Sequence, residues 1–447
     1  MKIIVGEEHV IVQGMRPEEN WWGKYQFPIP YHLGDRILVK VHVEDDDWYY
    51  PGIAHRWFES CDEGISWQEI DPKTEYNCGI LLPNGDRYYL LPGMGEELKD
   101  YVYEDTYYLT PDYDFKKRAP EGVIPIQDGM TFWFDGSVVR AYLAERLPKS
   151  LDRRFWEVKR IPKGETEPIE EKAEVEWKGL TRVIRFPAVN KYEDGMLKPI
   201  LERKSPYEGG VLKPIAPRGN PKVGPDGAIW VTSFSGEGHV DPETGQYNPY
   251  YSAEIFRSDD NGKSFEHRSH MEYPADGHKY PYKSGGFSDS DIAFMADGSM
   301  VWFLRSAWAC ATCQNWDPMY MSRSYDMGKT WSKPEVFAET GILPRLCQLD
   351  CGVTLLCYAR PGMYLAATKD GYEWEKVTVM KAEDRSHLAN DPIDKPFWHQ
   401  WDGACGNPEM IPIDDHSALL VYGDFYYPDD RGVKRKSILC RRITIEI

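Results

Sequence analysis

Two arginines stand at the ends of strand-like runs and suggest how a ligand could be held. Arg305 follows the run 300–304 and Arg360 follows the run 354–358. An arginine guanidinium can grip a carboxylate or a sulfate through two parallel hydrogen bonds. An Asp or Glu beside such a clamp can act as a general acid, and a His or Tyr can act as a base or nucleophile. These residue types therefore favour acid–base or nucleophilic chemistry on an anionic ligand.

The elements that position these residues are indicated by a repeated box, Ser-x-Asp-x-Gly-x-Ser/Thr-aromatic. It occurs at 60–67, 258–265 and 324–331, with a shortened copy at 368–374. The Asp carboxylate and the Ser hydroxyl can accept N–H groups of a tight turn, and Gly tolerates a positive φ. The aromatic residue can pack between neighbouring sheets. A turn this particular, recurring at wide spacing, predicts one β-unit repeated several times.

A second signal is a set of seven short turns rich in Gly and Asp, most of them flanked by strand-like runs. They lie at 33–35, 84–85, 135–136, 226–227, 297–298, 350–352 and 414–415. Turns and boxes alternate along the chain, with degenerate boxes assigned to 110–115 after the turn at 84–85 and to 150–156 after the turn at 135–136. We therefore predict an all-β fold, a β-propeller of four-stranded blades, seven by count with six as the alternative. Residues 2–12 would supply the outer strand that closes the ring. The chain would form a single domain, 1–447, with an insertion or an elongated blade around 164–206.

In such a ring, the first strands of the blades start, and the second strands end, around one mouth of the central channel. Many ionisable groups there would be costly unless water or an anionic, polyhydroxylated ligand shares them. Strand starts place Gln26, Asp289, Arg345 and Asn407 at this mouth. Strand ends add His42, Glu44, Asp45, Asp46, Glu145, Arg146, His239, Arg305, Arg360 and Asp424.

Composition excludes several other classes of function. A formal charge of −19 with no stripe of Lys or Arg argues against nucleic-acid binding. No apolar stretch approaches ~18 residues, so no membrane span is expected, and the N-terminus lacks a signal-peptide core.

Nine cysteines, an odd number, suit a reducing interior, and we expect a cytoplasmic protein. The lone pair Cys310 and Cys313 does not predict a zinc site, and no metal or cofactor is expected. The oligomeric state stays open.

The boxes resemble those of the sialidase (neuraminidase) superfamily, in which they mark propeller blades. The segments 287–305 and 319–331, and then 352–374, look like sialidase blades. The resemblance implies that Arg305 and Arg360 bind the substrate carboxylate and that Asp289 matches an acidic residue that partners a nucleophilic Tyr. Asp45 to Asp47 lie where the acid/base Asp of the family falls.

Three departures from the family pattern limit this resemblance. Gln26 stands where sialidases carry the first arginine of a carboxylate-binding triad, and Asp289 replaces a Glu. The stretch 401–409, where the nucleophilic Tyr is expected, contains no Tyr. His399 and Asp402, in the same part of the chain, are counted with Gln26 and Arg345 among the substrate-binding candidates.

Three functions follow as alternatives. The first is a sialidase-like glycosidase that acts on a small anionic oligosaccharide, with Asp289 and one of Asp45 or Asp46 in acid/base roles. The second is a lyase on uronate-containing sugars, which related-looking seven-bladed propellers suggest. Its proton-abstracting candidates are His42, His239, His399 and Tyr358. The third is a propeller that binds a glycan or a protein without turnover.

Overall fold

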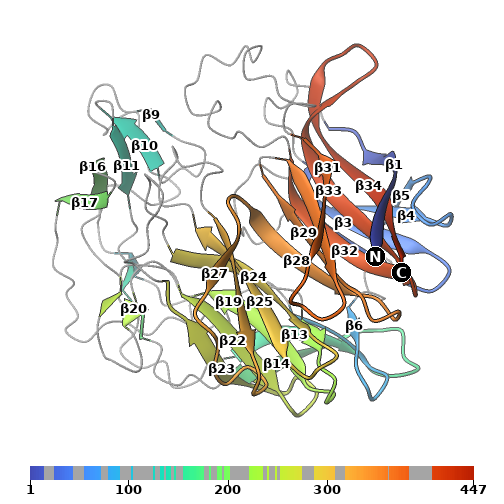
Figure 1. The fold of residues 1–447 in the computed structure, drawn as a ribbon, viewed down its shortest axis with the longest axis horizontal. Helices are drawn as coiled ribbons and strands as arrows, with labels where there is room; N and C mark the ends of the chain where they lie inside the picture. Colours follow the sequence, from blue (N-terminus) through green and yellow to red (C-terminus); the bar gives the residue numbers. More distant parts are fainter. Residues whose placement is uncertain are drawn as a thin grey trace.

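The protein is an all-β chain in every range that its computed structural model describes (Figure 1). These ranges are 1–14, 25–43, 55–71, 79–90, 155–175, 221–234, 252–273, 286–307, 318–360, 362–381 and 405–447, with short strands between them that are described by their backbone alone. The described part of the chain contains no helix with the length and hydropathy of a membrane span.

Four separate antiparallel sheets have four strands each. Unit 1 contains β2 (Tyr25–His32), β3 (Ile37–Val43), β4 (His55–Ser60) and β5 (Gln68–Ile70). Unit 4 contains β24 (Gly286–Phe294), β25 (Met300–Ala307), β26 (Met319–Ser324) and β27 (Glu335–Ala338). Unit 5 contains β28 (Ile342–Gln348), β29 (Thr354–Ala359), β30 (Met363–Thr368) and β31 (Glu375–Met380). Unit 6 contains β32 (Cys405–Asp414), β33 (Ser417–Pro428), β34 (Lys434–Glu446) and β1 (Lys2–Val12).

An eight-stranded sheet consists of two further units of the same kind. Unit 2 contains β6 (Ile80–Leu81), β7 (Arg87–Leu90), β13 (Phe155–Ile161) and β14 (Ile169–Val175). Unit 3 contains β18 (Lys222–Val223), β19 (Ile229–Phe234), β22 (Ala253–Ser258) and β23 (Ser264–Met271). Their outer strands β14 and β23 pair in parallel over two residue pairs, and this joins the two units.

The remaining strands form three smaller sheets. A five-stranded sheet contains β9 (Ile124–Pro125), β10 (Thr131–Phe134), β11 (Ser137–Ala141), β16 (Val189–Glu193) and β17 (Met196–Leu201). A pair contains β8 (Val102–Tyr103) and β12 (Glu145–Arg146). A three-stranded sheet contains β15 (Thr181–Arg182), β20 (His239–Val240) and β21 (Tyr247–Asn248).

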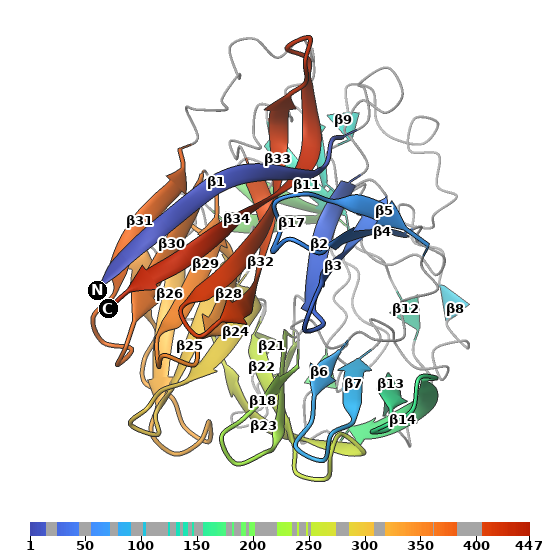
Figure 2. The same ribbon diagram turned by 90° about the vertical axis from the view of Figure 1, so that its right-hand side faces the viewer.

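Five hydrophobic clusters fill successive interfaces between the units. They lie between units 2 and 3, 3 and 4, 4 and 5, 5 and 6, and 6 and 1. Large buried side chains dominate them, with Trp156 between units 2 and 3 and Trp230 and Trp302 between units 3 and 4. The sheets therefore stack face to face in the order 2-3-4-5-6-1, as the blades of a propeller do, and Figure 2 shows the strands of neighbouring sheets fanned in this way.

The four boxes form the predicted turn at the hairpin between the third and fourth strands of their units. In the box of unit 3, Asp260 Oδ1 accepts the N–H of Ser264 at 2.9 Å and Oδ2 accepts the Ser264 hydroxyl at 2.6 Å. Gly262 has a φ of +82°, and a Cβ there would lie 2.5 Å from the Tyr88 ring of unit 2. The box glycine is thus required both by its turn and by the close approach of the preceding unit.

The described residues form six four-stranded units, and the predicted count of seven has no support among them. Six of the seven turn signals lie between a first and a second strand. The seventh, at 135–136, lies between β10 and β11 of the five-stranded sheet. Trp156, which we assigned to the box of a separate blade, lies on β13, the third strand of unit 2. Within the stretch 164–206, where we predicted an insertion or an elongated blade, β14 is the outer strand of unit 2.

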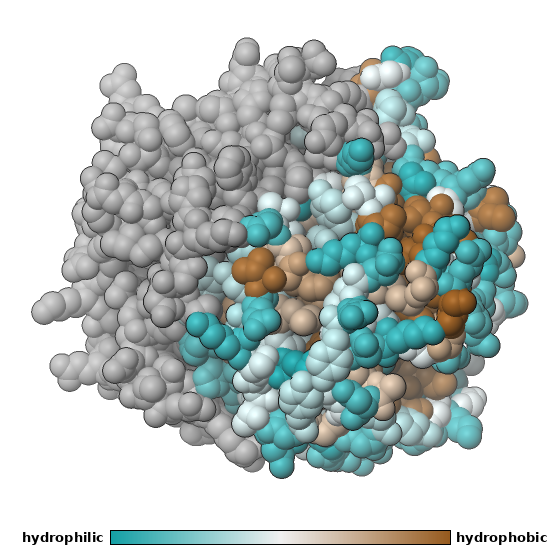
Figure 3. All heavy atoms as spheres, viewed as in Figure 1, coloured by the Kyte–Doolittle hydropathy of each residue, from teal (hydrophilic) through white to brown (hydrophobic). Residues whose placement is uncertain are grey.

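Residues 2–12 form an outer strand as predicted, because β1 pairs antiparallel with β34 at the edge of unit 6, and the closing of a ring by this strand stays a prediction. The two termini consequently lie side by side (Figures 1 and 2). On the face drawn in Figure 3, the described surface is mostly hydrophilic with scattered hydrophobic atoms, as expected for a chain with a net charge of −19.

Candidate functional site

The first strands of units 1, 4, 5 and 6 each carry a β-bulge near their start. In each bulge, three residue positions along the first strand lie opposite two positions along the second strand, so the first strand contains one extra residue. The bulges span Gln26–Ile29, Phe287–Ser290, Ile342–Arg345 and Gly406–Glu409. Because a bulge bends its strand and re-aims side chains, it turns the residues of this end toward new neighbours.

Three of the bulges also share a backbone signature. Phe27, Leu343 and Asn407 have positive φ values of 48°, 50° and 53°, and a proline follows each of them. A proline has no N–H to give, and a bulge leaves one position of the ladder unpaired, so proline is tolerated there. The bulge of unit 4 has no proline and carries Ser288 and Asp289 instead.

Asp289 and Arg305 form a buried ion pair at the bulge of unit 4. The bulge places Asp289 opposite Arg305 of β25, and Arg305 Nη1 donates to Asp289 Oδ2 at 2.7 Å. Both residues are more than nine-tenths buried. The hydroxyls of Ser288 and Ser290 and the Nε of Arg305 are also buried, and none has a hydrogen-bond partner among the described residues. The sequence named Asp289 and Arg305 as separate candidates at this end of the strands, and it did not point to the two serines.

A second set of ion pairs ties the first strands of neighbouring units together. Lys222 Nζ of β18 donates to Asp291 Oδ2 of β24 at 2.7 Å, and the same oxygen accepts the N–H of Leu346 of β28 at 2.7 Å. Arg345 of β28 donates through Nε to Glu409 Oε1 of β32 at 2.6 Å. This chain of contacts links units 3, 4, 5 and 6 around their inner edges.

Burial and mutual charge shift the pKa values within this set. Burial alone would lower the pKa of Arg345, but the carboxylates of Glu409, Asp291 and Asp289 outweigh it and the pKa is raised. Burial raises the pKa of Glu409, although Arg345 and Lys222 oppose that effect. Arg345, predicted as a substrate-binding residue, is therefore held by Glu409, and its guanidinium belongs to the framework of the inner strands.

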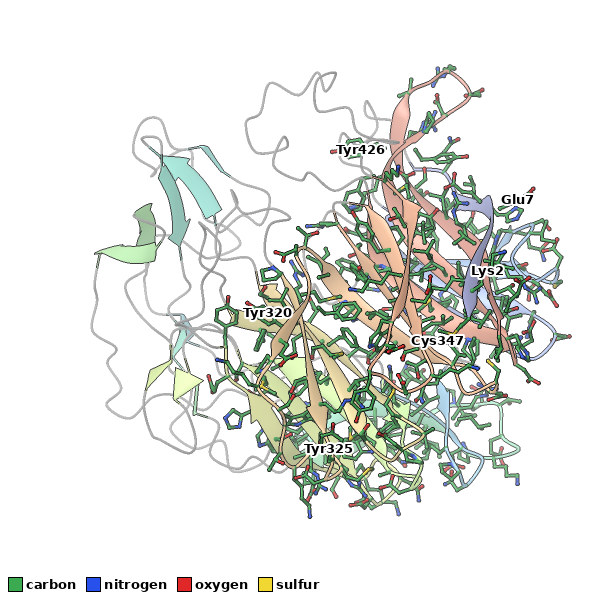
Figure 4. The ribbon with its side chains drawn as sticks, in the orientation of Figure 1. Lys2, Glu7, Tyr320, Tyr325, Cys347 and Tyr426 are labelled. Atoms are coloured by element: carbon green, nitrogen blue, oxygen red, sulfur yellow. The ribbon has the colours of Figure 1, made fainter. Side chains whose placement is uncertain are left out.

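Gln26 and Arg360 belong to a cluster around the Phe425 ring of β33. Lys436 Nζ of β34 donates to Gln26 Oε1 at 2.8 Å and lies 4.8 Å from the centre of the Phe425 ring. The Arg360 guanidinium carbon lies 5.8 Å from the centre of the same ring. All four side chains are more than nine-tenths buried. Tyr426, the next residue after Phe425, marks this end of the sheets in Figure 4, and Tyr325 of the unit 4 box marks the opposite end.

Lys436 was not predicted, because it lies on a third strand and the sequence pattern placed candidates only on first and second strands. A signal was present in β34. Lys436, Ile438 and Cys440 alternate along the strand and share one face, and the last two belong to the hydrophobic cluster between units 6 and 1. A lysine on the buried face of a strand needs a polar partner for its ammonium group, and here that partner is Gln26.

His42 lies at the end of β3, opposite Gln26. Its ring packs edge-on against the rings of Phe27 and His55, with ring centres 5.7 Å and 4.7 Å apart, respectively. Burial, reinforced by His55 and Lys40, lowers the pKa of His42 to about 3. The imidazole is therefore neutral at ordinary pH, and it is a weak base.

Tyr358 lies in the hydrophobic cluster between units 4 and 5. It stacks on Tyr364 with ring centres 5.2 Å apart. Burial, followed by the neighbouring Tyr364, raises its pKa to about 12. A phenol in this setting stays protonated at neutral pH, so its surroundings favour packing over proton abstraction.

The other predicted residues cannot be placed in the site. Asp45, Asp46, His399 and Asp402 lie outside the described residues, as do Cys310 and Cys313. His239 lies on β20, whose backbone alone is described, in a sheet separate from the six units. Among the described residues, no three His, Cys, Asp or Glu side chains gather as metal ligands would.

Comparisons with known proteins support the fold. No family model and no curated protein matches the chain. The structure matches that of a protein of unknown function from Dyadobacter fermentans with a TM-score of 0.54 and 15% identity, over 99% of each chain. It matches the NanB sialidase from Streptococcus pneumoniae with a TM-score of 0.46 and 13% identity, over 98% of this chain and 70% of that one. An α-L-arabinofuranosidase from Fusarium graminearum matches with a TM-score of 0.43 and 11% identity, over 99% of this chain and 98% of that one. The first likeness extends to the fold alone, and the other two are too distant to carry a conclusion.

Proposed function

We propose that this protein is an enzyme that cleaves a glycosidic bond in a small oligosaccharide bearing an acidic group. The observation that carries the proposal is the buried Asp289–Arg305 pair with its unsatisfied surroundings. Two serine hydroxyls and the Arg305 Nε are buried beside the pair without partners among the described residues. Each such atom costs about 1–3 kcal/mol until a partner arrives. A ligand with closely spaced hydroxyls, as in a sugar, supplies several partners at once.

The carboxyl of Asp289 is the proposed acid–base group. Arg305 holds one of its oxygens at 2.7 Å, which fixes the direction in which the other oxygen faces. Most glycosidases use two carboxyl groups, one on each side of the bond that breaks. One of Asp45 or Asp46, in the segment that follows β3, is proposed for the second role.

The lyase alternative finds less support in the geometry. A lyase needs a strong base to remove a proton next to the uronate carboxylate, and base strength follows pKa. With a pKa of about 3, His42 is poorly matched to that task. Tyr358 is buried in an apolar layer. We therefore favour hydrolysis.

A screen of anionic disaccharides and aryl glycosides tests the proposal, read both by release of reducing ends and by ultraviolet absorbance. We expect reducing ends without an absorbing product, since only a lyase leaves an unsaturated sugar. Asp289→Asn should lower kcat at least 100-fold, in the range that general acid–base groups contribute. Asp297→Asn is the matched control, because Asp297 caps a turn through the N–H of Ser299 at 2.9 Å. An absorbing product, or full activity of Asp289→Asn, would overturn the assignment.

A further inference from the structure

We infer that Tyr325 and Tyr372 form a platform that binds a neutral glycan, at the end of the sheets opposite the candidate site. Tyr325 lies in the box of unit 4, and Tyr372 lies in the shortened box of the neighbouring unit 5. Both positions are variable in the box pattern, so the turn itself does not require an aromatic residue there. The inference goes beyond the proposed function, because a platform of this kind holds a glycan without cleaving it.

The two tyrosines are exposed and contact each other. Their exposed fractions are 69% and 55%, and in the described part of the chain they are the only exposed aromatic side chains. Their phenol oxygens lie 3.0 Å apart and share a hydrogen bond. Figure 4 shows Tyr325 at the end of the sheets away from Tyr426. Single exposed apolar side chains are common on soluble proteins, but packing within either sheet does not account for an aromatic pair joined across two units.

The two box turns present these rings on a fixed backbone. Asp326 Oδ1 accepts the N–H of Thr330 at 2.9 Å and closes the turn that carries Tyr325. In the shortened box, Asp370 Oδ1 accepts the N–H of Tyr372 itself at 2.8 Å. Because the tyrosines are already positioned, binding a ligand on them costs little conformational entropy.

Arg323 of β26 supports the ring of Tyr372 from unit 4. It is buried, its Nη1 donates to Ser299 Oγ at 2.6 Å, and its guanidinium carbon lies 3.7 Å from the centre of the Tyr372 ring. Gly371 permits this approach, since a Cβ there would lie 2.7 Å from Arg323 Nη2. One face of Tyr372 therefore rests on a cation, and the exposed part of the ring is available to a ligand.

The surroundings of the pair favour a sugar over a protein partner. The neighbouring side chains on the two turns are polar and exposed, namely Lys329, Thr330, Lys369 and Glu373. The core of a protein interface is depleted of charged residues, and a stable interface buries about 800 Å² on each partner. Two rings among charges offer much less apolar surface than that. A sugar ring matches them, because its C–H face packs on an aromatic ring while its hydroxyls bond to polar neighbours.

Charge gives the platform no reason to select an acidic glycan. The exposed charges on the two turns have both signs, and the whole chain carries −19. A polyanion would be repelled at long range, whereas packing of a neutral ring on tyrosine needs no ion pair. The ligand class of the platform therefore differs from that of the candidate site, which we propose for an acidic group.

Affinity electrophoresis of the whole chain in native gels tests the platform without requiring turnover. Each gel contains galactomannan, xylan or mixed-linkage β-glucan as a neutral polymer, and one further gel contains polygalacturonate. We expect at least one neutral polymer to slow the wild type, and added salt to leave this retardation unchanged, because salt screens only charge interactions. Failure of all three neutral polymers to slow the protein overturns the inference.

Variants of the pair then locate the binding. Tyr325→Ala and Tyr372→Ala should each weaken it by about 5- to 30-fold, as loss of an aromatic anchor does, and Tyr325→Phe should retain most of it. Ile65→Ala is the matched control, because Ile65 is 63% exposed and follows the box glycine of unit 1 as Tyr372 follows that of unit 5. If Tyr372→Ala disturbs folding through Arg323, as judged by its melting curve, Tyr325→Ala decides. Wild-type binding by Tyr325→Ala overturns the inference.

The outcomes separate this inference from the proposed function. Asp289→Asn should bind the polymer as the wild type does, and Tyr325→Ala should cleave a small aryl glycoside as the wild type does. Polymer binding without any glycoside cleavage supports the platform and contradicts the enzyme. A self-association in sedimentation that Tyr325→Ala abolishes would assign the pair to an interface between copies, and it would overturn the platform.

Discussion

Two arginines at the inner strands have different roles, and the residues with which they pair determine these roles. Arg345 is partly buried and pairs with Glu409 at 2.6 Å, whereas Arg305 is fully buried and pairs with Asp289 at 2.7 Å. The partner of Arg345 belongs to the next unit, so that pair holds two blades together. The partner of Arg305 lies on the same unit, beside polar atoms that have no partner among the described residues. The second environment is the one that a ligand would complete.

His42 offers a test of burial at the residue scale. Its pKa falls from 6.5 to about 3 through burial first and then through His55 and Lys40. The unfolded chain therefore takes up a proton more readily than the folded one between these values. We expect the free energy of unfolding to fall as the pH drops below about 6.5, with a slope of at most ~1.4 kcal/mol per pH unit for this group.

Urea unfolding of His42→Phe across the same pH range measures this contribution. Phenylalanine keeps the packing against Phe27 but cannot take a proton, so the variant should lose part of the acid sensitivity. His32→Phe, at the other end of the same hairpin, serves as the control. Identical pH dependence in wild type and His42→Phe would show that His42 titrates normally.

Sequence reasoning found those site residues that strand periodicity exposes. Asp289 and Arg305 were predicted to lie at one end of neighbouring strands, and they are in contact. Gln26 was predicted at the same end, but its partner Lys436 comes from the far end of the chain. No local pattern links residues 410 positions apart. The pairing depends on the packing of unit 6 against unit 1 and on a bulge, and a single sequence specifies neither of them directly.

At the scale of the element, the bulges are the devices that build the site. Proline after a residue of positive φ recurs in units 1, 5 and 6. Proline inside a strand-like run already argues for an edge or a bulge, so this feature was open to prediction. Unit 4 departs from the pattern with Ser288 and Asp289, and the departure coincides with the candidate catalytic pair.

The bulge of unit 6 can be tested at Gly406. Alanine there would place a Cβ 2.9 Å from Phe425 Cζ, so the ring must move. We expect Gly406→Ala to cost about 1–3 kcal/mol of stability, as overpacking does. Urea unfolding measures this cost.

A double variant identifies the cause. Phe425→Leu shortens the side chain, so combining it with Gly406→Ala should recover stability relative to the sum of the single changes. Strict additivity of the two unfolding free energies would show that the alanine acts elsewhere.

At the scale of the whole molecule, the count of units shows where local spacing misleads. Unit 2 leaves its second strand at Leu90 and resumes with Phe155, so more than sixty residues separate strands that pair. A turn at 135–136 and an aromatic residue at 156 lie close together in the sequence and suggested a separate blade. The strands that carry this turn and this aromatic residue belong to different sheets. Segments that are close in the sequence therefore need not belong to the same unit.

The N-terminal strand makes the integrity of unit 6 testable as a property of the whole chain. Ile3 and Ile11 of β1 are buried, and Glu8 accepts hydrogen bonds from Tyr422 at 2.9 Å and from Arg441 at 2.8 Å. Burying an Ile contributes about 1.5–3 kcal/mol, so deleting residues 1–12 should cost at least ~3–6 kcal/mol and expose the edge of β34. A synthetic peptide of residues 1–12 should restore the lost stability by adding the strand in trans. The same peptide with Glu8→Lys should restore less, since the lysine repels Arg441. Thermal unfolding of the deletion variant with each peptide measures the effect. A deletion variant as stable as the full chain would show that unit 6 does not depend on β1.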